Sequence, residues 1–170
     1  MVPPPPERLP RDPARRLVAV TLDERSLAAR DPEAVRERCA AIADLLEDNH
    51  FALPGHDGGP YRLHVSLTHG RLALAVRDGE ENDVVIHLLS LRPFRRVVKD
   101  YFLVCESYYA AVRSAAPSQI EALDHGRRGL HNEASQLLID RLASKVEMDF
   151  DTARRLFTLI AALYWKGPGR

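Results

Sequence analysis

The stretch YRLHVSLTHGRLALAVR (61–77) alternates apolar and polar residues on both sides of His69-Gly70. Such alternation is typical of half-buried strands, and a two-residue connection that contains glycine predicts a β-hairpin. A two-residue turn fixes the register, so that Thr68 faces Arg71 and Arg62 faces Arg77. One surface of this hairpin then holds only apolar side chains and predicts a core face: Leu63, Val65, Leu67, Leu72, Leu74 and Val76.

The segments around this hairpin predict an α+β fold. LVAVTL (17–22) and DVVIHLLSL (83–91) have the composition of strands, which gives a small antiparallel sheet of about four strands. Asp31-Pro32 predicts the N-cap and first turn of a helix between the first two strands. After Pro93 the apolar period becomes helical, so that the C-terminal half is expected to consist of helices packed on the sheet.

The helices of the second half are expected in four stretches. Apolar stripes cover 93–113, 130–145 and 151–165, and Ser118 with Glu121 matches a capping box that starts another helix. The sequence leaves open whether 118–125 and 130–145 are two helices or one bent helix.

Composition favours one globular domain over residues 15–167, preceded by a disordered proline-rich tail at 1–14 that holds six of the twelve prolines. The N-terminus lacks the apolar stretch of a secretory signal, and no apolar run is long enough to cross a membrane, so we expect a cytoplasmic protein. Cys39 and Cys105 are expected to be reduced core thiols. No pattern indicates a cofactor or a metal site.

Charge is distributed unevenly along a chain whose net charge is zero. Residues 1–90 contain 11 Lys/Arg and 15 Asp/Glu, whereas residues 91–170 contain 13 and 9, giving −4 and +4. This asymmetry predicts either two halves that face each other or a basic half that meets an anionic partner. Four cations crowd the start of the helix that begins after Pro93, where they oppose the helix macrodipole: Arg92, Arg95, Arg96 and Lys99. That placement hints at an outside partner or at a neighbouring acidic surface.

The stretch DHGRRGLHNEAS (124–135) is the most unusual motif of the basic half. If Gly126 ended one helix and Gly129 preceded the next, the free amides there with Arg127 and Arg128 would suit a phosphate or carboxylate. The alternative is a turn between helices with solvated charges. The spacing lacks the GxxxxGK[ST] order of a phosphate loop, and the nearby histidines and Glu133 lack the spacing of metal ligands.

These residues support two functional hypotheses. The first is a non-catalytic binding or regulatory protein whose basic helix edges, around Arg95-Arg96 and Arg127-Arg128 and joined by Arg154-Arg155, contact an acidic protein or nucleic acid. The second is a small enzyme acting on a phosphorylated or carboxylated metabolite. It would use Arg127 and Arg128 as an anion clamp and His131 or Glu133 as general base.

The polar face of the sheet is a third candidate surface. The register places Arg62 opposite Arg77 beside His64, and His87, Val85 and Leu89 are expected on the same face. We expect the acidic first helix, which starts at Asp31 and ends before residue 54, to cover this face. The alternative is a partner surface or homodimer interface. The face lacks the aromatic residues on which RNA bases stack.

Five long motifs together resemble a bacterial family, the uncharacterised protein family 0262. They are RLVAVTLDE (16–24), GGPYRLHVSL (58–67), LSLRPFRRVVKDYFLVCESYY (89–109), PSQIEALDHGRRGLHNEAS (117–135) and DFDTARRLFTLIAALYW (149–165). The resemblance covers residues 16–167 and leaves out the proline-rich tail. It implies a cytoplasmic housekeeping protein of alphaproteobacteria, and it brings no catalytic or cofactor residues with it.

Overall fold

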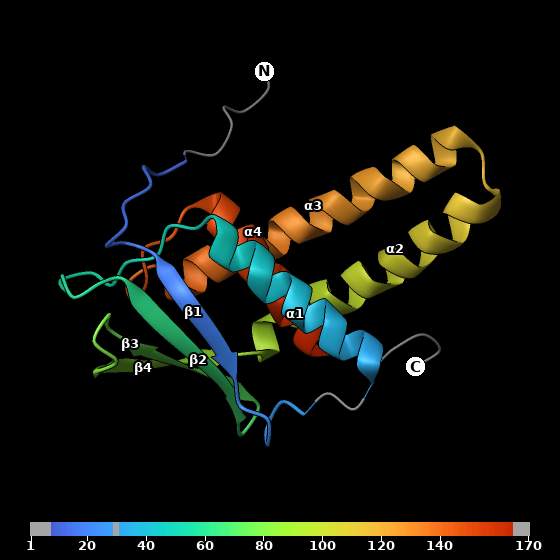
Figure 1. Ribbon diagram of the computed structural model, residues 1–170. Coiled ribbons are helices and arrows are strands. Elements are labelled where there is room, and N and C mark those ends of the chain that lie inside the picture. The colour runs from blue at the N-terminus through green and yellow to red at the C-terminus, as the bar shows by residue number, and fades with distance from the viewer. Residues whose placement is uncertain (1–7, 29–30, 165–170) are drawn as a thin grey trace.

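The computed structural model describes residues 8–28 and 31–164 and has the α+β architecture that the sequence predicts. One four-stranded sheet has the order β1 (Leu17–Leu22), β2 (Tyr61–Thr68), β3 (Arg71–Arg77) and β4 (Asp83–Ser90). The helices are α1 (Pro32–Glu47), α2 (Arg95–Ser114), α3 (Pro117–Leu142) and α4 (Phe150–Tyr164), with a short 3-10 turn, η1 (Arg92–Phe94), before α2. Three of the four helices therefore lie in the C-terminal half (Figure 1).

The β2–β3 hairpin has the predicted register along its whole length, from Thr68 opposite Arg71 to Arg62 opposite Arg77. Its two turn residues both have positive φ angles, 49° at His69 and 75° at Gly70. Two positive φ angles are the mark of the turn whose twist matches that of the flanking strands. Local sequence therefore sets this register.

The prediction of a wholly antiparallel sheet is wrong at one edge, because β1 pairs with β2 in parallel. The chain leaves β1, passes through α1 and returns to start β2 beside Leu17. Parallel neighbours need such a crossover, and the helix between the two strands supplies it. The sheet is therefore mixed.

All four helices lie on one side of the sheet (Figure 1). The hairpin leucines and valines of that side pack in one core with Leu45 of α1 and Phe157 of α4, except Leu67, which lies next to the turn and is 38% exposed. The prediction that α1 covers the face of Arg62 and His64 is wrong, because the apolar stripe of α1 packs against the opposite, apolar face. None of the described helices covers the polar face of the sheet.

The prediction that His87, Val85 and Leu89 lie on the same face of the sheet as His64 is also wrong. In the β3–β4 register these three residues lie opposite Leu74, Val76 and Leu72, on the core side of the sheet. The open face of β4 instead carries Ile86 and Leu88. The sequence of β4, DVVIHLLS, has apolar residues at both its odd and its even positions, so it does not show which side chains face the core. The register with β3 shows it.

Helix α3 settles the question left open around residue 126, since it is continuous over 26 residues. Gly126 and Gly129 lie inside it, so no helix ends or begins there. The predicted capping box is corrected as well: Ala116 is the N-cap residue, Pro117 occupies the first turn and no side chain caps the helix. Packing against α2 and α4 outweighs the cost of roughly 1 kcal/mol that each glycine adds. The α2–α3 hairpin projects beyond the sheet (Figure 1).

The two cysteines differ from each other. Cys105 is buried in α2, as predicted, but Cys39 is exposed on α1, so the prediction of a core thiol is wrong there. Both are free thiols. Cys39 follows Arg38, whose side chain is buried and donates to the carbonyl oxygen of Leu27, so α1 turns Arg38 inward and Cys39 outward.

Candidate functional site

A hollow of about 310 Å³ opens where α1, α3 and α4 meet. Four of its residues come from α4, one from α3 and one from α1. They are Asp44, His131, Asp151, Arg154, Arg155 and Thr158. The α4 residues fall on one face of that helix because they are spaced by three, one and three positions. The opposite face of α4 holds buried Leu156, Phe157 and Ile160 and fixes the helix against the core.

Arg154 is the cation of this hollow that has no anionic partner. None of the described carboxylates lies within ion-pair distance of its guanidinium, and its Nε is buried without a hydrogen-bond partner. Its neighbour Arg155 is fully engaged, since it pairs with Asp44 at 3.5 Å and with Asp48 at 3.3 Å. A buried, unpaired donor of an arginine is costly, and a bound anion would remove part of that cost.

His131 forms the floor of the hollow on α3. The Thr158 hydroxyl donates to the carbonyl oxygen of Arg154 at 3.0 Å, so it accepts a hydrogen bond from Nε2 of His131 at 2.9 Å. The other ring nitrogen, Nδ1, is buried without a partner. Burial, together with the positive charges of Arg154 and Arg127, lowers the pKa of His131 to about 4. The ring is therefore neutral at pH 7.

This low pKa predicts a specific loss of stability in acid. The unfolded chain binds a proton at a histidine with a pKa of 6.5, whereas the folded chain binds it only near pH 4. Stability should therefore fall as the pH drops through this window, by about 2 kcal/mol between pH 7 and pH 5 from His131 alone. The His131→Gln variant keeps a donor for Thr158 but cannot titrate. Urea unfolding at several pH values should show a flatter dependence for the variant, and parallel curves would contradict the assignment.

The predicted anion clamp is occupied by a carboxylate of its own helix. Arg127 and Arg128 both pair with Asp124, Arg128 at 3.1 Å, and Arg127 also lies over the ring of Tyr108. Because residue 129 is inside α3, no free helix-start amides accompany these arginines. The positive charge of Arg127 nevertheless helps to lower the pKa of His131, so its electrostatic field reaches the hollow.

The remaining predicted residues are separated from the hollow. Arg96 pairs with Glu133 at 2.7 Å and with Asp100 at 3.5 Å, and both Arg96 and Glu133 are exposed. Arg95 is exposed at the start of α2, where its charge acts on Tyr164. His131 is buried whereas Glu133 is exposed, so these two candidate bases do not act on one point.

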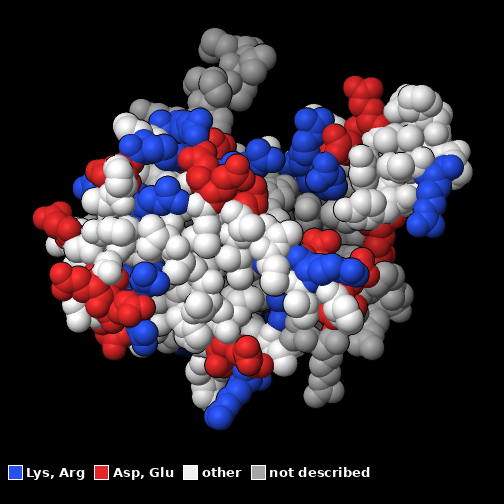
Figure 2. Space-filling model, in the orientation of Figure 1, with Lys and Arg blue, Asp and Glu red and all other residues white. Residues whose placement is uncertain are grey.

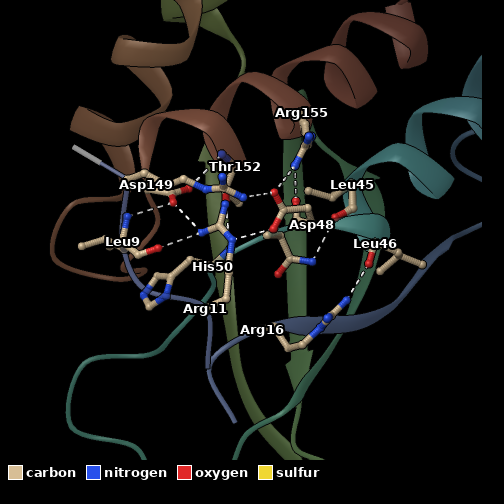
Figure 3. A network of polar contacts seen from close by, with 12 residues as sticks. Leu9, Arg11, Arg16, Leu45, Leu46, Asp48, His50, Asp149, Thr152 and Arg155 are labelled. Atoms are coloured by element: carbon tan, nitrogen blue, oxygen red, sulfur yellow. Dashed lines mark hydrogen bonds and ion pairs between the residues drawn. The ribbon is translucent and has the colours of Figure 1, made fainter. Parts of the chain in front are cut away.

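A second polar cluster lies close to the hollow and was not foreseen from the sequence (Figure 3). Asp149 has a fully buried side chain and caps α4 by accepting from the amide of Thr152 at 3.0 Å. Its other oxygen accepts from Arg11 at 2.6 Å and from the amide of Leu9 at 3.2 Å. Arg11 also pairs with Asp48 at 2.6 Å. The sequence predicts the start of this helix near Asp151, and the cap lies two residues earlier.

The hydrogen bonds and ion pairs of this cluster lower the pKa of both of its aspartates. The hydrogen bond from Arg11 lowers the pKa of Asp48 to about 2 against the effect of burial, and Arg155 contributes in the same direction. Burial alone would raise the pKa of Asp149, but the bonds from Thr152 and Arg11 outweigh it and the pKa is lowered. Arg8 and Arg11 belong to the predicted tail, and Arg8 pairs with Asp48 at 2.5 Å while Arg11 pairs with Asp48 and Asp149, so the described part of the tail lies against the folded part. Residues 1–7 of that tail lie outside the described residues.

One face of the molecule can be seen to be mixed in charge (Figure 2). On the face shown in Figure 2, basic and acidic side chains alternate, and no continuous basic ridge joins them. No group of three or more His, Cys, Asp or Glu side chains in the described part of the chain is placed to hold a metal ion. None of the described helices has the length and apolar character to span a bilayer.

Known proteins resemble this chain over nearly its whole length. A protein of Agrobacterium fabrum is 58% identical over 152 residues, which cover 89% of this chain and 96% of that protein. One of Xanthobacter autotrophicus is 62% identical over 156 residues, covering 91% and 95% of the two chains. Both carry the name UPF0262 protein. No solved structure matches.

The match to the family is equally extensive. The model of the uncharacterised protein family (UPF0262) spans residues 14–166, which include the hollow, the whole sheet and the two aspartates of the polar cluster, Asp48 and Asp149, but not Leu9 and Arg11. The resemblance carried by the five sequence motifs is thereby confirmed: this chain belongs to the uncharacterised protein family UPF0262.

Proposed function

We propose that this protein is a non-catalytic binding module of the cytoplasm that takes a carboxylate of an acidic protein partner into the hollow between α1, α3 and α4. The observation that carries the proposal is Arg154, a cation that pairs with none of the described carboxylates and lies beside a neutral histidine. An incoming carboxylate would meet the guanidinium of Arg154 and the positive field of Arg127. Such charge-assisted bonds are among the strong ones in proteins.

Acidic residues at the rim favour a single carboxylate over a polyanion. Asp44 and Asp151 line the same hollow, and Asp44 keeps Arg155 occupied. A nucleic acid backbone would bring several phosphates close to these two carboxylates. The predicted residues Arg96, Arg127 and Arg128 already pair with carboxylates of this chain. They could bind a partner only if those ion pairs were replaced by pairs with the partner's carboxylates. Arg95 makes no ion pair with the described residues and is free to add a peripheral contact.

The enzyme alternative rests on His131, which shares the hollow with Arg154. A general base works best with a pKa near the ambient pH, and a pKa of about 4 makes this imidazole a weak base at pH 7. Its unprotonated nitrogen is buried away from the hollow's solvent, and Glu133 is engaged by Arg96. These contacts favour binding over catalysis.

The Arg154→Gln substitution tests the proposal. We expect a hexaglutamate peptide to shift the Nε–H resonance of Arg154 in an NMR titration, because that proton is the unpaired donor. Arg154→Gln should weaken peptide binding at least tenfold, which corresponds to about 1.4 kcal/mol. Arg113→Gln is the matched control, since Arg113 is exposed at the far end of α2 and loses the same charge.

The outcomes separate the hypotheses. Equal peptide affinity of wild type and Arg154→Gln would contradict the site. Tighter binding of a single-stranded DNA with the same charge as the peptide would point to a nucleic acid partner instead. Turnover of a phosphorylated or carboxylated metabolite that disappears in His131→Gln would support the enzyme.

A further inference from the structure

Strand β4 is an edge of the sheet whose outer side is unpaired. It pairs with β3 alone, and no backbone hydrogen bond from another described segment reaches it. The opposite edge differs, because the side chain of Asn49 bonds both the amide and the carbonyl oxygen of Leu17 on β1. An open row of N–H and C=O groups is a template for another strand.

The usual devices that protect an edge are absent from the middle of this strand. DVVIHLLS contains no proline and no lysine, and its one charge, Asp83, stands at its first position. A register shift next to Arg77 disturbs the pairing only near that end. Ile86 and Leu88, on the open face, are 65% and 45% exposed. An exposed, apolar edge of this length marks a site of strand addition.

Charges at the two ends of β4 are complementary to each other. The turn before the strand is acidic, with Glu80 exposed and unpaired among the described residues. The segment after it is basic, and three of its exposed cations make no ion pair with a described carboxylate: Arg92, Arg95 and Lys99. When a strand pairs with an antiparallel copy of itself, the start of each copy meets the end of the other. The acidic turn of one copy would then lie beside the basic segment of its partner.

Antiparallel pairing of β4 with a second copy of β4 would also account for the cations at the start of α2. They oppose the helix macrodipole, and α2 has no acidic residue in its first turn and no side-chain cap. The cost of that placement is offset if a partner's carboxylates lie next to it. A strand from an unrelated protein would need the same charges in the same order, whereas a second copy has them automatically.

We propose that two copies of this chain associate by antiparallel pairing of β4 with β4, which joins two four-stranded sheets into one. The two-fold axis is perpendicular to the sheet and passes near Ile86, so both open faces lie on the same side. Each half of the interface contributes the same residues, as in an isologous dimer. This inference does not depend on the hollow at Arg154.

Sedimentation equilibrium of the full chain gives the first test. We expect twice the chain mass of 19.1 kDa for the wild type. Ile86→Lys should raise the dimer dissociation constant at least tenfold, because two lysines would meet near the axis. Its side chain is mostly solvated, so circular dichroism should stay unchanged. Leu103→Lys on α2, 53% exposed, is the control and should dimerise like the wild type. A single-chain mass at every concentration would overturn the proposal.

Charge reversal identifies the orientation of the partner. Glu80→Arg and Arg92→Glu should each weaken the dimer, and the double variant should restore it, because acidic and basic ends are then exchanged in both copies. Amide hydrogen exchange separates strand pairing from face-to-face stacking, since only pairing protects the outward amides of β4 as concentration rises. No rescue in the double variant, or β4 amides that exchange equally in dilute and concentrated protein, would overturn β4 pairing.

Discussion

We expect the Asn49→Leu substitution to lower the free energy of unfolding by about 4 kcal/mol. Asn49 is 2% exposed and follows Asp48, the C-cap residue of α1. Its oxygen accepts from the amide of Leu17 at 2.8 Å, and its amide group donates to the carbonyl oxygens of Leu17 at 3.1 Å and Leu45 at 2.9 Å. Leucine has nearly the same shape but leaves three backbone groups unsatisfied, at roughly 1–3 kcal/mol each when they stay buried.

Urea unfolding followed by circular dichroism measures this effect. In a chain of this size 4 kcal/mol corresponds to a drop in Tm of about 8–16 °C. Asn132→Leu is the matched control, because Asn132 is exposed on α3 and its side chain makes no hydrogen bond with the described residues. The control should stay within about 0.5 kcal/mol of the wild type. Equal stability of Asn49→Leu and Asn132→Leu would show that Asn49 does not hold β1 to α1.

The second large effect is expected at Asp149, whose replacement by alanine should cost about 3 kcal/mol. Alanine removes the N-cap of α4, typically about 1 kcal/mol, together with the buried partner of Arg11 and of the Leu9 amide. Because α4 carries Arg154, Arg155 and Thr158, fraying of its first turn would also disturb the hollow. Thermal denaturation should place Tm about 6–12 °C below that of the wild type.

Asp149→Asn separates the cap from the charge. An amide oxygen still accepts from Thr152, so this variant should lose less than the alanine variant. Combining each change with Arg11→Gln in a double-mutant cycle measures the ion pair. The lowered pKa of Asp149 adds a pH test: its contribution is complete above pH 3.8 and is lost as the pH falls through the lower folded pKa. Two variants as stable as the wild type at pH 7 would contradict the role of Asp149.

Much of the candidate site is formed by contacts between residues far apart in the chain, and such contacts leave no recognisable motif in the sequence. Arg154 and Arg155 are adjacent in the sequence and look equivalent there. The structure separates them because Arg155 donates to the carbonyl oxygen of Asp48, 107 positions away, and pairs with two carboxylates of the α1 region. The cap at Asp149 could have been predicted from the sequence, because aspartate is a preferred N-cap residue whose side chain accepts a hydrogen bond from an amide two or three positions later. Its bond to Arg11 was not.

The sequence by itself determined the family, the α+β class, the register of the 61–77 hairpin and the start of α1 at Asp31-Pro32. These features follow from neighbours in the chain: alternation of period two, a turn with two positive φ angles, and an aspartate that caps its own helix. Tertiary structure alone decided the parallel direction of β1, the inward side of β4, the continuity of α3 through two glycines and the unpaired state of Arg154. Each of those depends on which distant surface a segment packs against, and that choice is set by burial and pairing between residues far apart in the sequence.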